Sequence, residues 1–235
     1  MQIRIVPVTP LQQNCSLIWN EETKHAVLVD PGGDADKLIG ALDHFGLTLT
    51  RMWLTHGHLD HAGAAAALRE RTGVAVEGPH RDDQFWLDRI EDDAQRYGLS
   101  DLRNVTPDRY FEDGEALDFE GARFEVLHTP GHTPGHVVIY NAPLNVAFVG
   151  DVLFAGSIGR TDFPRGDHAQ LIGSITAKLW PLGDDVTFVP GHGPTSTFGR
   201  ERQSNPFVAD RITGYQGAEK QAPDIGEQRS SKRWT

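Results

Sequence analysis

The sequence is poor in cysteine, in basic charge and in long apolar runs. Its one cysteine, Cys15, has no partner for an intramolecular disulfide, which fits a reducing compartment. The 22 Lys and Arg against 33 Asp and Glu leave a net charge of −11, which argues against nucleic acid or an anionic membrane as main partner. No apolar run has the length of a transmembrane helix, and the start MQIRIVPVTP lacks a signal-peptide pattern. We therefore expect a cytoplasmic protein of one or at most two domains.

What the sequence does contain is a dense cluster of metal-ligand residue types. Residues 55–61 read THGHLDH, directly after an apolar stretch. His56 and His58 can project to the same side of a turning segment that bends at Gly57. Asp60 and His61 stand where an Ala-rich helix is predicted to begin, so their side chains leave the turn in another direction. One turn can thus feed two adjacent sites for a borderline divalent cation, the alternative being a loop of hydrogen-bonded surface histidines.

Three further apolar runs end in the same residue types. Residues 124–127 lead into HTPGHTPGH at 128–136, residues 146–149 into Gly150-Asp151, and residues 186–189 into Pro190-Gly-His192-Gly. Short apolar runs followed by Gly and Pro are typical of buried strands that end in sharp turns. Functional groups gather at such strand ends in layered α/β folds, so one shared site explains the four loops better than four coincidences.

In this order the motifs HGHLDH, GHTPGH, GD and GH resemble those of the metallo-β-lactamase superfamily, from about residue 3 to residue 206. The resemblance implies an α/β fold arranged as a four-layer αββα sandwich. It also implies two divalent metal ions, for which we expect zinc, although iron and manganese suit the same ligands. By the resemblance the first ion is bound by His56, His58 and His132, the second by Asp60, His61 and His192, and Asp151 bridges both.

This ligand set predicts hydrolysis without a Ser or Cys nucleophile. Two cations lower the pKa of a bridging water from about 15.7 to roughly 7, so that a metal-bridging hydroxide can attack a carbonyl that one cation polarises. Asp60 and Asp151 are the carboxylates that we expect to be catalytic. Asp30 and His136 are candidates for orienting the ligands; their alternatives are a turn former before Pro31 and a loop hydrogen bond.

Within the superfamily the pattern resembles glyoxalase II, the hydroxyacylglutathione hydrolases, and in particular their short bacterial members. The substrate implied is a small-molecule thioester such as S-lactoylglutathione. Arg160 falls where that family has a lysine that helps to hold glutathione, and Arg165 is a second candidate, with a salt bridge to a neighbouring aspartate as its alternative. The sequence departs from the family in lacking the C-terminal helical domain and two expected tyrosines, one replaced within 161–163 and one at 193–194.

A second activity stays open at this point. The segment GRTDF at 159–163 and residues 201–206 also resemble persulfide dioxygenases of the same superfamily, which consume oxygen at a single iron. Their ligands correspond to His56, His132 and Asp151. We favour the hydrolase, and a non-catalytic metal-binding module explains an open site with a bridging carboxylate less well.

The remaining pattern predicts the elements around these loops. We expect strands at 3–8, 15–19, 26–29 and 49–54, and helices at 34–45 (with Asp34 as N-cap), 62–71, 168–179 and 198–208. Charged residues 81–97 predict surface helices, in which Phe85 and Trp86 either border the site or simply pack. The prediction is one domain over 1–213 and a disordered tail over 214–235; four histidines are expected at the surface, namely His25, His44, His80 and His168. The sequence does not indicate an oligomeric state.

Overall fold

The structure is a computed structural model in which residues 1–216 are described. The expected tail at 214–235 therefore falls mostly outside the described residues. Of its first residues, Gly214 ends the last helix in a left-handed conformation, and Tyr215 packs partly buried under the guanidinium of Arg202. The boundary at 213 coincides with a helix end and stays a prediction.

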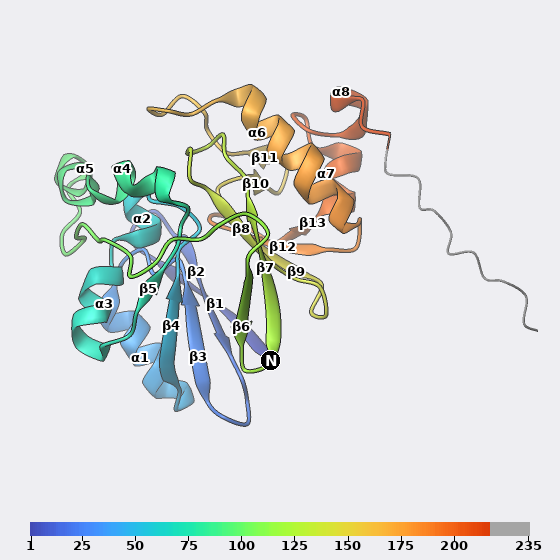
Figure 1. Ribbon diagram of the computed structural model, residues 1–235. Coiled ribbons are helices and arrows are strands. Elements are labelled where there is room, and N and C mark those ends of the chain that lie inside the picture. Colours follow the sequence, from blue (N-terminus) through green and yellow to red (C-terminus); the bar gives the residue numbers. More distant parts are fainter. Residues whose placement is uncertain (217–235) are drawn as a thin grey trace, which may run out of the picture.

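Two sheets form the centre of the fold (Figure 1). In the first sheet the strands follow the order of the chain, antiparallel from β1 to β3 and parallel from β3 to β5. Its strands are β1 (Gln2–Val8), β2 (Gln13–Trp19), β3 (His25–Val29), β4 (Thr48–Trp53) and β5 (Val76–Glu77).

The second sheet has six strands in the order β13-β12-β9-β8-β7-β6, and only β9 and β12 run parallel. Its strands are β6 (Ala116–Phe119), β7 (Ala122–His128), β8 (Val137–Asn141), β9 (Val146–Gly150), β12 (Thr187–Pro190) and β13 (Ser196–Thr197). A separate short hairpin joins β10 (Leu153–Phe154) to β11 (Ser157–Ile158).

The alternation of side chains along the strands sorts the core into three layers. In β2, Leu17 faces the helices that cover the first sheet, whereas Ile18 faces the second sheet. In β8, Ile139 belongs with Ile18 to the core between the sheets, and Val138 belongs to the core between the second sheet and its helices. This two-residue period is what a strand buried on both faces requires.

Helices cover the outer face of each sheet, so the fold is the expected αββα sandwich, and residues 1–216 contain no separate C-terminal helical domain (Figure 1). Helices of the first half are α1 (Ala35–Phe45), α2 (Leu59–Ala62), α3 (Ala65–Thr72), 3-10 turn η1 (Arg81–Asp83), α4 (Gln84–Leu87) and α5 (Ile90–Tyr97). Those of the second half are α6 (His168–Ser174), π-helical η2 (Ile175–Leu179), 3-10 turn η3 (Trp180–Leu182), α7 (Phe198–Ser204) and α8 (Asp210–Thr213). Among the described residues, none of these helices is long and apolar enough to cross a membrane.

Two predicted helix starts differ in detail. The helix expected at 62–71 is interrupted between α2 and α3, because the backbone N–H of Ala64 donates to the carbonyl of Pro31 instead of continuing the helical ladder. Asp34 does precede α1, but its side chain accepts a hydrogen bond from the backbone N–H of Thr9 and makes no cap bond. Both differences come from contacts with loops distant in the sequence.

The four motif loops lie together at one edge of the sandwich, where their strands end. Strands β4, β7, β9 and β12 each end just before one of them, as the sequence predicted. The loops after β9 and β12 are joined directly, because the N–H of Gly191 donates to the carbonyl of Gly150 at 2.7 Å. The site is thus assembled from both sheets.

Candidate metal centre

The first ligand group consists of three buried imidazoles. The Nδ1 atom of His58 lies 3.1 Å from Nε2 of His56 and 3.0 Å from Nε2 of His132. His56 and His58 leave the turn after β4, and His132 comes from the loop after β7. A tetrahedral zinc ion with Zn–N bonds of about 2.0–2.1 Å separates its nitrogen ligands by about 3.3 Å, so the three atoms suit one such ion.

The second group is Asp60, His61 and His192, which the structure also brings within metal-binding distance of one another. The Nε2 atom of His192 lies 3.1 Å from Oδ2 of Asp60. His61 is fully buried on α2, whereas His192, in the loop after β12, is partly exposed. This half of the site is therefore the one open to solvent.

Asp151 lies between the two groups. Its Oδ2 atom is 3.7 Å from Nε2 of His132 and 3.8 Å from Nε2 of His192, and its Oδ1 atom is 3.3 Å from Nε2 of His61. Among the described residues, His61 Nε2 and Asp151 Oδ1 are buried polar atoms without a hydrogen-bond partner. Buried polar atoms are seldom left unpaired, so these two fit a site that binds a cation.

The electrostatics differ between the groups. Burial lowers the pKa of His132, that of His58 to about 3, and that of His56 well below its usual value, so the first group offers neutral nitrogen lone pairs. Burial acts in the same direction on His61, but Asp151 and Asp60 outweigh it and raise the pKa of His61 well above its usual value. A cation and a proton compete for that nitrogen, so metal binding there releases a proton.

Of the two candidates for orienting the predicted ligands, Asp30 contacts the ring of His61, whereas His136 makes the loop hydrogen bond that was its alternative. The Oδ2 atom of Asp30 lies 2.8 Å from Nδ1 of His61 and accepts a hydrogen bond from the hydroxyl of Thr55 at 2.6 Å. The Nε2 atom of His136 accepts the backbone N–H of Asp151 at 3.1 Å, and its ring stacks on His56. A carboxylate or carbonyl behind a ligand histidine sets its tautomer and orientation.

Two further residues beside the ligands, Gln13 and Asp83, were not predicted from the sequence. The Nε2 atom of Gln13 lies 3.4 Å from Nδ1 of His61, and Asp83 binds backbone and hydroxyl groups of both histidine loops. Gln13 pairs with His192 in an isolated bridge between segments far apart in the sequence. No local motif marks such residues, because both reach the site through contacts between segments far apart in the chain.

Aromatic side chains border the first group on one side. The ring of Trp86, which is buried, meets the ring of His58 edge-on with centroids 4.5 Å apart, and Phe163 meets His58 at 5.0 Å. Of the two possibilities for Trp86, bordering the site is therefore correct. Phe163 lies in the segment 161–163, where the resemblance to glyoxalase II implies a tyrosine, and this wall is apolar there.

The two predicted substrate residues lie in the loop that contains Phe163. The guanidinium of Arg160 makes two hydrogen bonds to Asp162, at 2.9 and 2.8 Å, and its side chain is 66% exposed. It also covers the ring of Phe163. Arg165 lies 4.1 Å from the ring centroid of Phe85 rather than in an ion pair with an aspartate of the described chain. Neither arginine contacts a predicted metal ligand through its side chain.

The four histidines expected at the surface lie away from both ligand groups. His25 pairs with Glu120, and His44 and His168 are exposed. His80 is only 20% exposed and stacks on His128 with centroids 4.3 Å apart. Together with Asp82 they bring three ligand atoms within 4.8 Å of one another, in a group that is more exposed than the strand-end groups and shares no residue with them.

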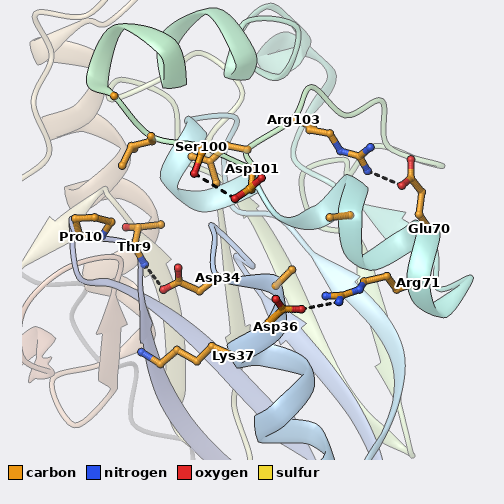
Figure 2. A pocket seen from close by; sticks show the side chains of 15 residues that line it. Thr9, Pro10, Asp34, Asp36, Lys37, Glu70, Arg71, Ser100, Asp101 and Arg103 are labelled. Atoms are coloured by element: carbon orange, nitrogen blue, oxygen red, sulfur yellow. Dashed lines mark hydrogen bonds and ion pairs between the residues drawn. The ribbon is translucent and has the colours of Figure 1, made fainter.

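A cavity of about 890 Å³ lies beside α1, α3 and the loop after α5, apart from the ligand groups (Figure 2). Arg71 pairs there with Asp36 and Arg103 with Glu70, while Lys37 donates to the carbonyl of Pro7. The cavity therefore presents no converging set of free donors like that of the strand-end site.

The chain is similar to known proteins over nearly its whole described length. The hydroxyacylglutathione hydrolase GloC of Haemophilus influenzae is 51% identical to this chain over 209 residues, which are 88% of this chain and 98% of that protein. The probable metallo-hydrolase YqgX of Bacillus subtilis is 34% identical, over 88% of this chain and 98% of its own length.

Solved structures of similar proteins share the fold of this chain. The structure of TTHA1623 in a di-iron-bound form has a TM-score of 0.79 at 38% identity and covers 87% of this chain and 100% of its own. The B3 metallo-beta-lactamase BLEG-1 has a TM-score of 0.81, also at 38% identity, over 88% and 99%. ETHE1 of Myxococcus xanthus follows with 0.73 at 31% identity, over 89% and 85%.

The family model named metallo-beta-lactamase superfamily matches residues 8–192, which include every strand-end motif from His56 to His192. This match agrees with the αββα sandwich and with the two His/Asp groups at its edge. The chain belongs to the metallo-beta-lactamase superfamily.

Proposed function

We propose that this protein is a dinuclear metal-dependent hydrolase that cleaves a small-molecule thioester such as S-lactoylglutathione. The observation that carries the proposal is Asp151, whose two oxygens lie within 3.8 Å of nitrogens from both ligand groups. Similarity to GloC over nearly the whole of both proteins supports the substrate class. Two ions bound side by side suit an acyl transfer in which both the attacking and the leaving atom need stabilisation.

The ligands divide between two sites in this proposal. Two bound cations would supply a water of lowered pKa and polarise the substrate carbonyl. The first site is formed by His56, His58 and His132, the second by Asp60, His61 and His192, and Asp151 is shared.

The other residues of the site orient the ligands and shield them from bulk water. Asp30 holds His61 through Nδ1 and leaves Nε2 directed at Asp151. Trp86 and Phe163 form an apolar wall beside His58, which keeps bulk water from that side and favours an uncharged part of the substrate there. Arg160, exposed at the end of this wall, is the proposed partner of a substrate carboxylate, with Arg165 nearby.

The second candidate is a mononuclear iron persulfide dioxygenase that uses His56, His132 and Asp151. ETHE1 supports it through fold and 31% identity, but GloC at 51% identity favours hydrolysis. The presence of a complete second ligand group also favours the dinuclear enzyme.

Both reactions can be measured on one preparation of defined metal content. We expect release of thiol from S-lactoylglutathione by protein loaded with zinc or iron, and no oxygen uptake with glutathione persulfide. Metal-free protein is the control. Oxygen uptake by the iron-loaded protein without thioester cleavage would replace the proposal by the second candidate.

A further inference from the structure

Asp83 is a completely buried carboxylate that belongs to none of the metal-ligand motifs. It ends the 3-10 turn η1, and its three hydrogen-bond donors are neutral. Its Oδ2 atom accepts the N–H of Gly57 at 2.8 Å and the hydroxyl of Thr133 at 2.7 Å. Its Oδ1 atom accepts the N–H of Gly135 at 2.6 Å. No lysine or arginine within residues 1–216 forms an ion pair with it.

These donors belong to both loops that supply the first ligand group. Gly57 stands between His56 and His58, and Thr133 directly follows His132. One carboxylate therefore connects the turn after β4 with the loop after β7, two segments about seventy-five residues apart in the chain. The nitrogen atoms that converge at 3.0 and 3.1 Å come from these same two loops.

The turn that contains Asp83 also explains a glycine in each loop. A Cβ atom at Gly57 would lie 2.8 Å from the carbonyl oxygen of Asp83, and one at Gly135 would lie 2.4 Å from its backbone nitrogen. Neither glycine has a positive φ, so the requirement is space rather than conformation. Both loops are thus pressed against the backbone of η1 while their N–H groups reach its carboxylate.

We propose that Asp83 is the positioning residue of the first metal site: it sets the spacing between the His56–His58 turn and the His132 loop and thereby determines the affinity of that site for metal. This inference rests on the proposed function only in taking these histidines as ligands. An ionised carboxylate among neutral partners is costly to bury, and three converging donors are what such a group needs to be retained. Asp83 itself contacts no ligand side chain.

The test compares Asp83→Asn with the nearby Asp88→Asn. Asparagine keeps the volume but turns one acceptor into a donor that faces an N–H or O–H group. Asp88 is a matched control, because it is exposed and its carboxylate accepts a hydrogen bond from the side chain of Gln84 instead of from the two loops. Metal-free protein is titrated with Co²⁺, and backbone hydrogen exchange of Gly57 and Gly135 is followed without metal.

We expect Asp83→Asn to weaken the first site about 10- to 100-fold, as for other residues behind metal ligands, and the second site less than about threefold. The two glycine amides should exchange faster in Asp83→Asn, and Asp88→Asn should match the wild type. If Asp83→Asn fails to fold, Thr133→Val, which removes one donor, should show a smaller loss at the same site. Equal losses at both sites, or unchanged affinity with unchanged exchange, would overturn the inference. If the wild type bound no Co²⁺, the proposed function would fail, while amide exchange would still test the link between the loops.

Discussion

The Nε2 atom of His61 lies 3.3 Å from the Oδ1 atom of Asp151, and within residues 1–216 neither atom has a hydrogen-bond partner. His61 lies after β4 of the first sheet, and Asp151 follows β9 of the second sheet. The pair therefore joins the two halves of the sandwich at the site. Asp30 fixes the other nitrogen of the same ring. A bridging carboxylate and the second ion would have to meet at this pair, so the metal content and activity of variants at the site depend on it.

Asp151→Ala should lower the metal content to one ion or fewer per chain and reduce thioester hydrolysis by more than about 100-fold. Loss of a residue behind a ligand already costs 10- to 100-fold, and loss of a shared ligand affects both ions. Elemental analysis and turnover on the same sample check this. Asp162→Ala, which removes an exposed carboxylate outside the ligand groups, should keep two ions. Two ions and normal turnover in Asp151→Ala would show that Asp151 is not shared.

His192→Ala separates the two candidate reactions. In a dinuclear hydrolase it empties or loosens the second site and should make thioester cleavage as slow as it is in His56→Ala. In a mononuclear dioxygenase His192 is not a ligand, so oxygen uptake should largely survive. Thiol release and oxygen uptake by both variants are the measurements. Hydrolysis that persists in His192→Ala but not in His56→Ala would count against two metal ions.

Arg160→Ala should raise KM and leave kcat nearly unchanged, because a contact remote from the carbonyl contributes equally to ground and transition states. A lost charge-assisted hydrogen bond of about 1.5–3 kcal/mol corresponds to a 10- to 100-fold fall in kcat/KM. Since Asp162 binds the same guanidinium, Asp162→Ala should lower KM. Kinetics on thioesters with and without the carboxylate check both variants; equal losses on the two substrates would make Arg160 structural.

Burial raises the pKa of Asp83 to about 6, despite the hydrogen bonds from Thr133, Gly57 and Gly135. Between its usual value of 3.8 and about 6 the folded protein binds a proton that the unfolded chain has released, so rising pH lowers the free energy of unfolding. Asparagine does not titrate. The stability of metal-free wild type relative to Asp83→Asn should therefore fall by about 2.4 kcal/mol from pH 4 to pH 7. Urea unfolding at several pH values measures this, and parallel stability curves would contradict it.

The sequence predicted the ends of the central strands and the metal-ligand residue types that follow them, because both are local patterns. It could not separate Asp82 from Asp83: the two stand side by side in a charged segment, yet one is exposed and the other completely buried. Gln13 was missed for a similar reason, since its approach to His61 depends on how β2 meets the loop after β12. The break between α2 and α3 likewise depends on the distant carbonyl of Pro31. What the sequence left open are contacts between segments far apart in the chain.

The most direct test of the account is a titration of metal-free protein with zinc or iron while thioester hydrolysis is followed. Because Asp151 is proposed to serve both ligand groups, full activity should require two equivalents per chain, with little activity from the first alone. The stoichiometry is read at protein concentrations well above the dissociation constants. Activity that reaches its maximum at two equivalents is the predicted result, and a maximum already reached at one equivalent would contradict the dinuclear hydrolase.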